Sequence, residues 1–162
     1  MSDLDMGAAA LGWWHRHLGD SGARRATRAR LRRASAPVEA LQVEAVHDLN
    51  RMLDGALTGQ ADKLALIAVA LANLRENTME KAAERMAGRV APLRFQRLVR
   101  IEAPGDLIVP LRRALAQIDG AANVAALARD LFHWSDPVRT RWCFSYYGAT
   151  SAAPEQPEET KA

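Results

Sequence analysis

The sequence predicts an all-α protein, a compact bundle of about seven to nine helices. Alanine and leucine dominate the 162 residues, while valine, isoleucine and aromatic residues are sparse, and this balance favours helices over strands. With 49% hydrophobic and 25% charged residues, the composition is globular and the chain is long enough to bury a core. Apolar residues also recur at helical spacing along nearly the whole chain.

Two helices are predicted at the start of the chain. Residues 4–18 form the first, and Gly19 ends it. Its apolar stripe consists of Leu4, Leu11, Trp14 and Leu18. The arginine-rich segment that follows continues as a second helix to about Ala34, since its residues include stripes at i, i+4 and i+8.

Two more helices complete the first half. Ser35 is expected to cap a helix with Pro37 in its first turn, which extends to about Leu53. Residues 61–75 are apolar on almost every face, which indicates a central, buried helix.

The second half contains five further segments with helical periodicity. They cover approximately residues 78–87, 92–100, 107–118, 123–134 and 138–147. Pro110 is expected in the first turn of its helix or at a kink. Trp134, Trp142 and Tyr146 are periodic with the apolar face, so core packing is favoured over base stacking for these rings.

One domain is predicted over residues 1–148, followed by an acidic, Pro/Glu-rich tail over 149–162 that we expect to be disordered. We find no internal repeat and no signal peptide. The longest uncharged apolar run, residues 64–74, is too short to cross a bilayer. We therefore expect a cytoplasmic protein with no membrane partner.

No catalytic motif is present, so we expect a protein that is not an enzyme and has no metal or cofactor. Gly-rich phosphate loops, HExxH and nucleophile elbows are absent from the sequence. His15 and His17 are two residues apart, so on a helix they point in different directions. The single cysteine, Cys143, excludes an internal disulfide and a Cys-based zinc site. Its apolar surroundings favour a small hydrophobe over a dyad with His133.

Clustered arginine is the strongest functional signal. The net charge is only +3, yet fourteen of nineteen arginines fall in residues 16–33 and 85–113. Residues 24–33 read RRATRARLRR, with no acidic residue in the run, and like charges at helical spacing cost about a few tenths of a kcal/mol per pair. A solvated helix face is the alternative. A segment that tolerates this repulsion is nevertheless expected to meet a polyanion, and the guanidinium fork suits phosphate.

Arginines on several short helices suggest a groove that follows a phosphate backbone rather than one helix that reads bases. The candidate nucleic-acid-binding residues are Arg24, Arg25, Arg28, Arg30, Arg32, Arg33, Arg94, Arg97, Arg100, Arg112, Arg113, Arg139 and Arg141.

Four stretches, spread in order over residues 10–147, carry a family resemblance. They read LGWWHRHL, RARLRRASAP, LRFQRLVRIEAPGDLIVPLRRAL and LARDLFHWSDPVRTRWCFSYY. With them the chain resembles the CasB family, the small subunit of the type I-E CRISPR Cascade surveillance complex. Basic positions of the family's pattern correspond here to Arg32, Arg33, Arg100, Arg112, Arg113, Arg139 and Arg141, and the remaining arginines of residues 24–33 extend it.

The resemblance implies a non-catalytic, all-α subunit present as two copies in a complex that carries crRNA. Such a subunit contacts the other Cascade subunits and its own second copy. It helps to hold the target DNA strand on the guide and lines a basic path for the displaced strand. R-loop formation is nearly balanced in free energy, so modest backbone contacts are enough to favour it.

Two alternatives remain open from the sequence. A free-standing, non-specific nucleic-acid-binding helical protein would bind single strands tightly without partners. An arginine-rich protein–protein adaptor would use the same side chains on acidic subunits, and its binding would survive nuclease treatment.

Overall fold

The computed structural model describes the backbone of residues 1–155 and the side chains of residues 1–148. Ten helices and one pair of short strands make up the described chain, which confirms the all-α prediction. The first half contains α1 (Asp3–His17), α2 (Gly22–Arg33), α3 (Pro37–Leu41), α4 (Glu44–Met52) and α5 (Ala61–Ala72). The second half contains α6 (Ala82–Met86), α7 (Pro92–Arg100), α8 (Pro104–Gln117), α9 (Val124–Phe132) and α10 (Asp136–Glu155).

The helix predicted from Ser35 to Leu53 is in fact two helices, which raises the number from the expected nine or fewer to ten. Val43 separates α3 from α4 with an extended backbone (φ −91°, ψ 119°) and a buried side chain. A β-branched residue adopts that conformation readily, and neither glycine nor proline marks the break in the sequence. Glu39, not Ser35, caps α3: its Oε1 accepts hydrogen bonds from the backbone N–H groups of Ser35 (2.6 Å) and Ala36 (3.3 Å).

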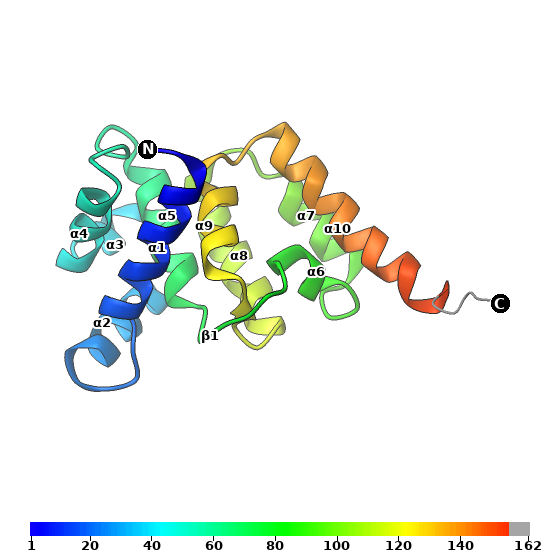
Figure 1. The fold of residues 1–162 in the computed structure, drawn as a ribbon, viewed down its shortest axis with the longest axis horizontal. Helices are drawn as coiled ribbons and strands as arrows, with labels where there is room; N and C mark the ends of the chain where they lie inside the picture. Colours follow the sequence, from blue (N-terminus) through cyan, green and yellow to red (C-terminus); the bar gives the residue numbers. More distant parts are fainter. Residues whose placement is uncertain (156–162) are drawn as a thin grey trace.

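Helix α5 is the centre of the first half. Every residue from Leu64 to Ala72 is buried, as its apolar sequence predicts. Helices α2, α3, α4, α8 and α9 pack against it, and α1 lies across α4 and α9 (Figure 1). The arginine-rich helix α2 is therefore held against the core by only a few of its side chains.

Helix α1 buries Trp14 and, at its C-cap, Leu18 of the expected stripe, but its buried face also includes residues outside that stripe and excludes Leu4. Leu4 is 77% exposed, whereas Met6, Ala10 and Trp13 are buried. The large indole of Trp13 determines which side of α1 turns inward, and its N–H donates to the Ala45 carbonyl at 2.7 Å.

Helices α6, α7 and α10 form a second group at the other end of the molecule, and α10 extends away from the body (Figure 1). Strand β1 (Glu76–Asn77) pairs in parallel with β2 (Ala121–Ala122). The sequence did not predict this pair, because two-residue strands have no alternation to detect. Pro104 begins α8, so Pro110 lies inside that helix and not in its first turn.

Aromatic residues of the second group are part of the core, as predicted. Trp134, Trp142 and Tyr146 are all buried. Buried indoles need an acceptor for their N–H, and Trp134 donates to Ile101 O at 2.8 Å while Trp142 donates to Asp130 Oδ2 at 2.8 Å. Phe95 stacks on Tyr146 with ring centroids 4.0 Å apart and joins α7 to α10.

The last helix continues to Glu155, beyond the helical segment expected to end near Tyr147. Residues 156–162 lie outside the described residues, so the predicted disorder of the acidic tail stays a prediction there. Among the helices that the structure describes, none combines the length and the apolar character needed to cross a membrane.

Candidate nucleic-acid interface

Five of the six arginines of α2 lie on the surface, and one lies in the core. Arg28 is only 6% exposed. Its Nη2 donates to the Leu18 carbonyl at 3.0 Å, and its Nη1 lies 3.7 Å from Asp20 Oδ1. Burial lowers the pKa of the Arg28 guanidinium, a shift that Asp20 opposes. Arg28 therefore ties α2 to the end of α1, and we leave it out of the interface.

Arg24 and Arg25 are exposed at the start of α2, where they also stabilise the preceding turn. Arg24 Nη2 donates to Ser21 Oγ at 3.1 Å, and Arg25 Nε donates to the Asp20 carbonyl at 2.8 Å. The three remaining arginines, Arg30, Arg32 and Arg33, are exposed nearer the end of the helix.

The end of α2 faces α8 across a hollow of about 370 Å³, here called the α2–α8 hollow. Its lining consists of Ala29, Arg32, Arg33, Asn73, Arg112, Arg113 and Ala116. Arg112 also fixes the two helices together, since its Nη1 donates to the carbonyls of Arg32 (3.2 Å) and Ala34 (2.7 Å). Arginines far apart in the sequence thus meet at one place.

A second hollow of about 250 Å³, the α7–α8 hollow, lies next to the first. Its lining consists of Arg94, Arg97, Leu98, Ile101, Pro110, Arg113 and Ala114. Arg113 lines both hollows, so the two adjoin at this residue of α8. The six arginines that line them form what we call the basic surface: Arg32, Arg33, Arg94, Arg97, Arg112 and Arg113.

No arginine of the basic surface takes part in an ion pair within the described part of the chain. The positive charge of several guanidinium groups is therefore not offset by ion pairs, and a polyanion is attracted to it. Three helices contribute, and apolar carbon from Leu98, Ile101 and Pro110 forms part of the floor. Such a surface can hold successive phosphates without distinguishing bases.

The remaining predicted residues are not part of this surface. Arg139 has a largely buried side chain, 15% exposed, that donates to the Val99 carbonyl at 3.2 Å and pairs with Asp136. Arg141 pairs with Asp130 at 3.0 Å. Arg100 is exposed at the end of α7 but lines neither hollow.

Sequence reasoning missed Arg75 and Asn73, which follow the buried helix α5. Asn73 lines the α2–α8 hollow, and its Nδ2 donates to the Val69 carbonyl at 2.8 Å. Arg75 is exposed, and its charge helps to lower the pKa of Arg28, which puts it close to α2. Neither residue belongs to an arginine-rich segment, so only the fold could associate them with the basic surface.

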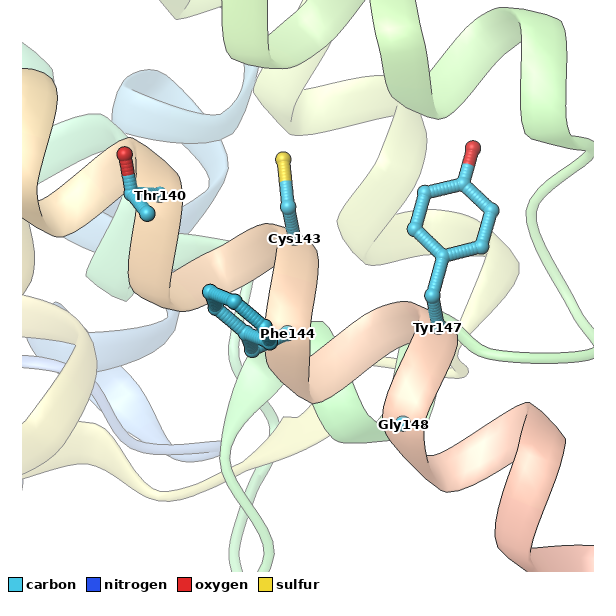
Figure 2. A pocket seen from close by; sticks show the side chains of 5 residues that line it. All are labelled: Thr140, Cys143, Phe144, Tyr147 and Gly148. Carbon is cyan, nitrogen blue, oxygen red and sulfur yellow. The ribbon is translucent and has the colours of Figure 1, made fainter.

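An apolar hollow of about 460 Å³ lies along α10, lined by Thr140, Cys143, Phe144, Tyr147 and Gly148. Cys143 and Tyr147 extend from the same side of the helix, and the Phe144 ring extends in another direction (Figure 2). No charged residue lines this hollow. His133, which the sequence offered as a partner for Cys143, is hydrogen-bonded to Asp3, with His133 Nε2 and Asp3 Oδ1 2.9 Å apart. Within the described residues, no three His, Cys, Asp or Glu side chains are placed to hold a metal.

Three comparisons relate the chain to known proteins. A family model described as CRISPR-associated protein Cse2 matches residues 27–147. The CRISPR-associated protein Cse2 of Thermus thermophilus is 34% identical over 89 residues, which cover 52% of this chain and 53% of that protein. The match thus spans about half the length of the curated relative.

Solved structures have a similar fold. A chain of Escherichia coli Cascade bound to a PAM-containing double-stranded DNA target has a TM-score of 0.68 and 19% sequence identity. CasB from Thermus thermophilus has a TM-score of 0.63 and 23% identity. Each alignment covers 88% of this chain and 97% of the other. At these identities the likeness concerns the fold.

Proposed function

Because the chain belongs to the CRISPR-associated protein Cse2 family, we propose that it is a non-catalytic, nucleic-acid-binding subunit of a type I-E Cascade complex. In this role it contacts the other subunits, the crRNA and a second copy of itself. Its arginines stabilise the crRNA–target DNA heteroduplex and the displaced strand in cytoplasmic antiviral defence.

The observation that carries this proposal is that the two arginine-lined hollows adjoin at Arg113. A strand that follows both hollows passes from α2 across α8 to α7 and meets guanidinium groups throughout. Each group can donate two parallel hydrogen bonds to a phosphate. Because the exchange of duplex for heteroduplex is nearly balanced, a few such contacts are enough to favour the open R-loop.

The structural neighbour from Escherichia coli supports the choice of partner. That chain belongs to a Cascade complex bound to a DNA target, and 88% of the present chain has the same fold. The proposal extends that association to this chain and assigns the contacts to its own basic surface.

Co-purification of the tagged full-length chain from its host tests the proposal. Recovery with Cascade subunits and a discrete crRNA is the expected result. Recovery alone, together with tight single-strand binding by the pure protein, would instead identify a free-standing binder. A complex whose composition and salt dependence are unchanged by nuclease would identify an adaptor, because the arginines would then contact protein.

A further inference from the structure

A fourth hollow, of about 250 Å³, lies where α1, α9 and α10 approach the residue before α6. We call it the α9 hollow, and its lining consists of Asp3, Lys81, Ala126, Arg129, Asp130, His133 and Arg141. Only Arg141 among these is a residue predicted from the sequence to contact nucleic acid.

The two carboxylates in the α9 hollow already have partners. Asp3 Oδ1 lies 2.9 Å from His133 Nε2, and Asp130 accepts from both Arg141 (3.0 Å) and the Trp142 indole (2.8 Å). Arg129 and Lys81, by contrast, have no side-chain hydrogen bond or ion pair to any residue that the structure describes. Three full cations, Lys81, Arg129 and Arg141, thus face two carboxylates in this hollow, and the side chains of Arg129 and Lys81 make no ion pair in the described chain.

Gly7 leaves space for the Arg129 guanidinium beside α1. A Cβ at this position of α1 would lie 2.4 Å from Arg129 Nη1 and 3.2 Å from the Ala125 Cβ. Only glycine leaves room for the guanidinium to lie against the α1 backbone. A larger residue at position 7 would shift the guanidinium, which gives a way to move this charge without removing it.

We propose that Arg129 and Lys81 bind a backbone phosphate of the nucleic acid, at a contact separate from the basic surface. This inference rests on the proposed function. The planar guanidinium can contact two phosphate oxygens, and the ammonium adds a point charge. A strand that leaves the basic surface presents a further phosphate at every nucleotide, so a second contact on the same protein lengthens the bound tract.

The test compares two glycine substitutions in α1 with a direct charge removal. Gly7→Ala keeps both cations but displaces the Arg129 guanidinium, and Arg129→Gln removes its charge. Gly12→Ala is the matched control, since its Cβ would meet only the Met52 methyl, at 3.8 Å. Binding of a single-stranded oligonucleotide to the full-length chain is measured over a salt series.

We expect Arg129→Gln to weaken binding by about tenfold at low salt and to reduce the slope of log affinity against log salt by about 0.7. Gly7→Ala should weaken binding in the same direction, and Gly12→Ala should leave it unchanged. Equal losses in both glycine variants would contradict the proposal, because the effect would then come from the helix backbone.

Arg113→Ala separates this inference from the proposed function. If Arg113→Ala weakens binding and Arg129→Gln does not, the phosphate contact at the α9 hollow is wrong and the proposed function stands. If neither variant changes binding, both fail. A rise in melting temperature with inorganic phosphate that Arg129→Gln abolishes, without any change in oligonucleotide binding, would assign the hollow to a free anion and overturn the nucleic-acid contact.

Discussion

Arginines occur in two regions of the molecule, but what faces them differs. On the basic surface of α2, α7 and α8, the six guanidinium groups take part in no ion pair within the described chain. In the α9–α10 region, Arg139 and Arg141 are each paired with an aspartate. The number of arginines in a segment therefore does not measure its capacity to bind an anion. Whether a carboxylate lies beside a guanidinium group decides whether that group is free to bind an anion.

The largest expected effect concerns the α9–α10 region, where Asp130 joins a surface arginine to a buried indole. Trp142→Ala should lower the free energy of unfolding by about 3–5 kcal/mol, because it removes a buried ring and its hydrogen bond to Asp130. Urea denaturation measures the change. Phe144→Ala in the same helix is the control, since this ring is 75% exposed and its loss should cost less than about 0.5 kcal/mol. Equal losses would mean that this region lacks a packed core.

Helix α2 allows the comparison to be made within one segment, because Arg28 is buried and Arg32 is exposed one turn later. Arg28→Ala should lower the free energy of unfolding by about 1–3 kcal/mol, since the Leu18 carbonyl loses its donor and the buried stem is removed. The slope of log nucleic-acid affinity against log salt should stay unchanged in the Arg28→Ala variant. Arg32→Ala should reduce that slope and leave the free energy of unfolding unchanged. A reduced slope for Arg28→Ala in a fully folded protein would return Arg28 to the interface.

The third prediction compares one arginine from each of these two regions. Arg113→Ala should reduce the slope of log affinity against log salt by about 0.7 for a single strand, without a change in melting temperature. Arg139→Ala should leave the slope unchanged and destabilise the fold by about 1–2 kcal/mol, because its largely buried guanidinium holds the Val99 carbonyl. Arg112 is a poorer test, since it also bonds to the end of α2. If Arg139→Ala alone alters the slope, the assignment of the two regions is reversed.

Much of the fold follows from local sequence. Residues 64–72 lack a polar face, and a helix of this kind can only be central. Trp134 and Trp142 were predicted from their periodicity to lie in the core, and both are buried. The break at Val43 and the β1–β2 pair depend on tertiary contacts, so the sequence pattern did not reveal them. The exposed Leu4 shows the same limit, because Trp13 decides the orientation of α1.

For the candidate site, the sequence identified the residue type but not the partners. The run of arginines predicted a polyanion, yet burial of Arg28 depends on the position of α1, and the pairing of Arg141 depends on α9. Asn73 lines the α2–α8 hollow only because α5 ends beside α2. Periodicity describes one helix at a time, whereas an anion-binding surface depends on which charges adjacent helices contribute.

The smallest expected effect concerns Glu39, a carboxylate at the edge of the basic surface. Hydrogen bonds from the Ser35 and Ala36 backbone N–H groups lower its pKa, and the charge of Arg112 adds to the shift. A carboxylate with a lowered pKa stabilises the fold above the pKa of the unfolded chain, and this contribution is lost as the pH falls through the folded pKa. Part of the stability should therefore disappear below about pH 4. Glu39→Gln should make the urea midpoint less dependent on pH in that range. If Glu39→Gln left the pH dependence of the urea midpoint unchanged, then neither the cap of α3 nor the charge of Arg112 would lower the pKa of Glu39.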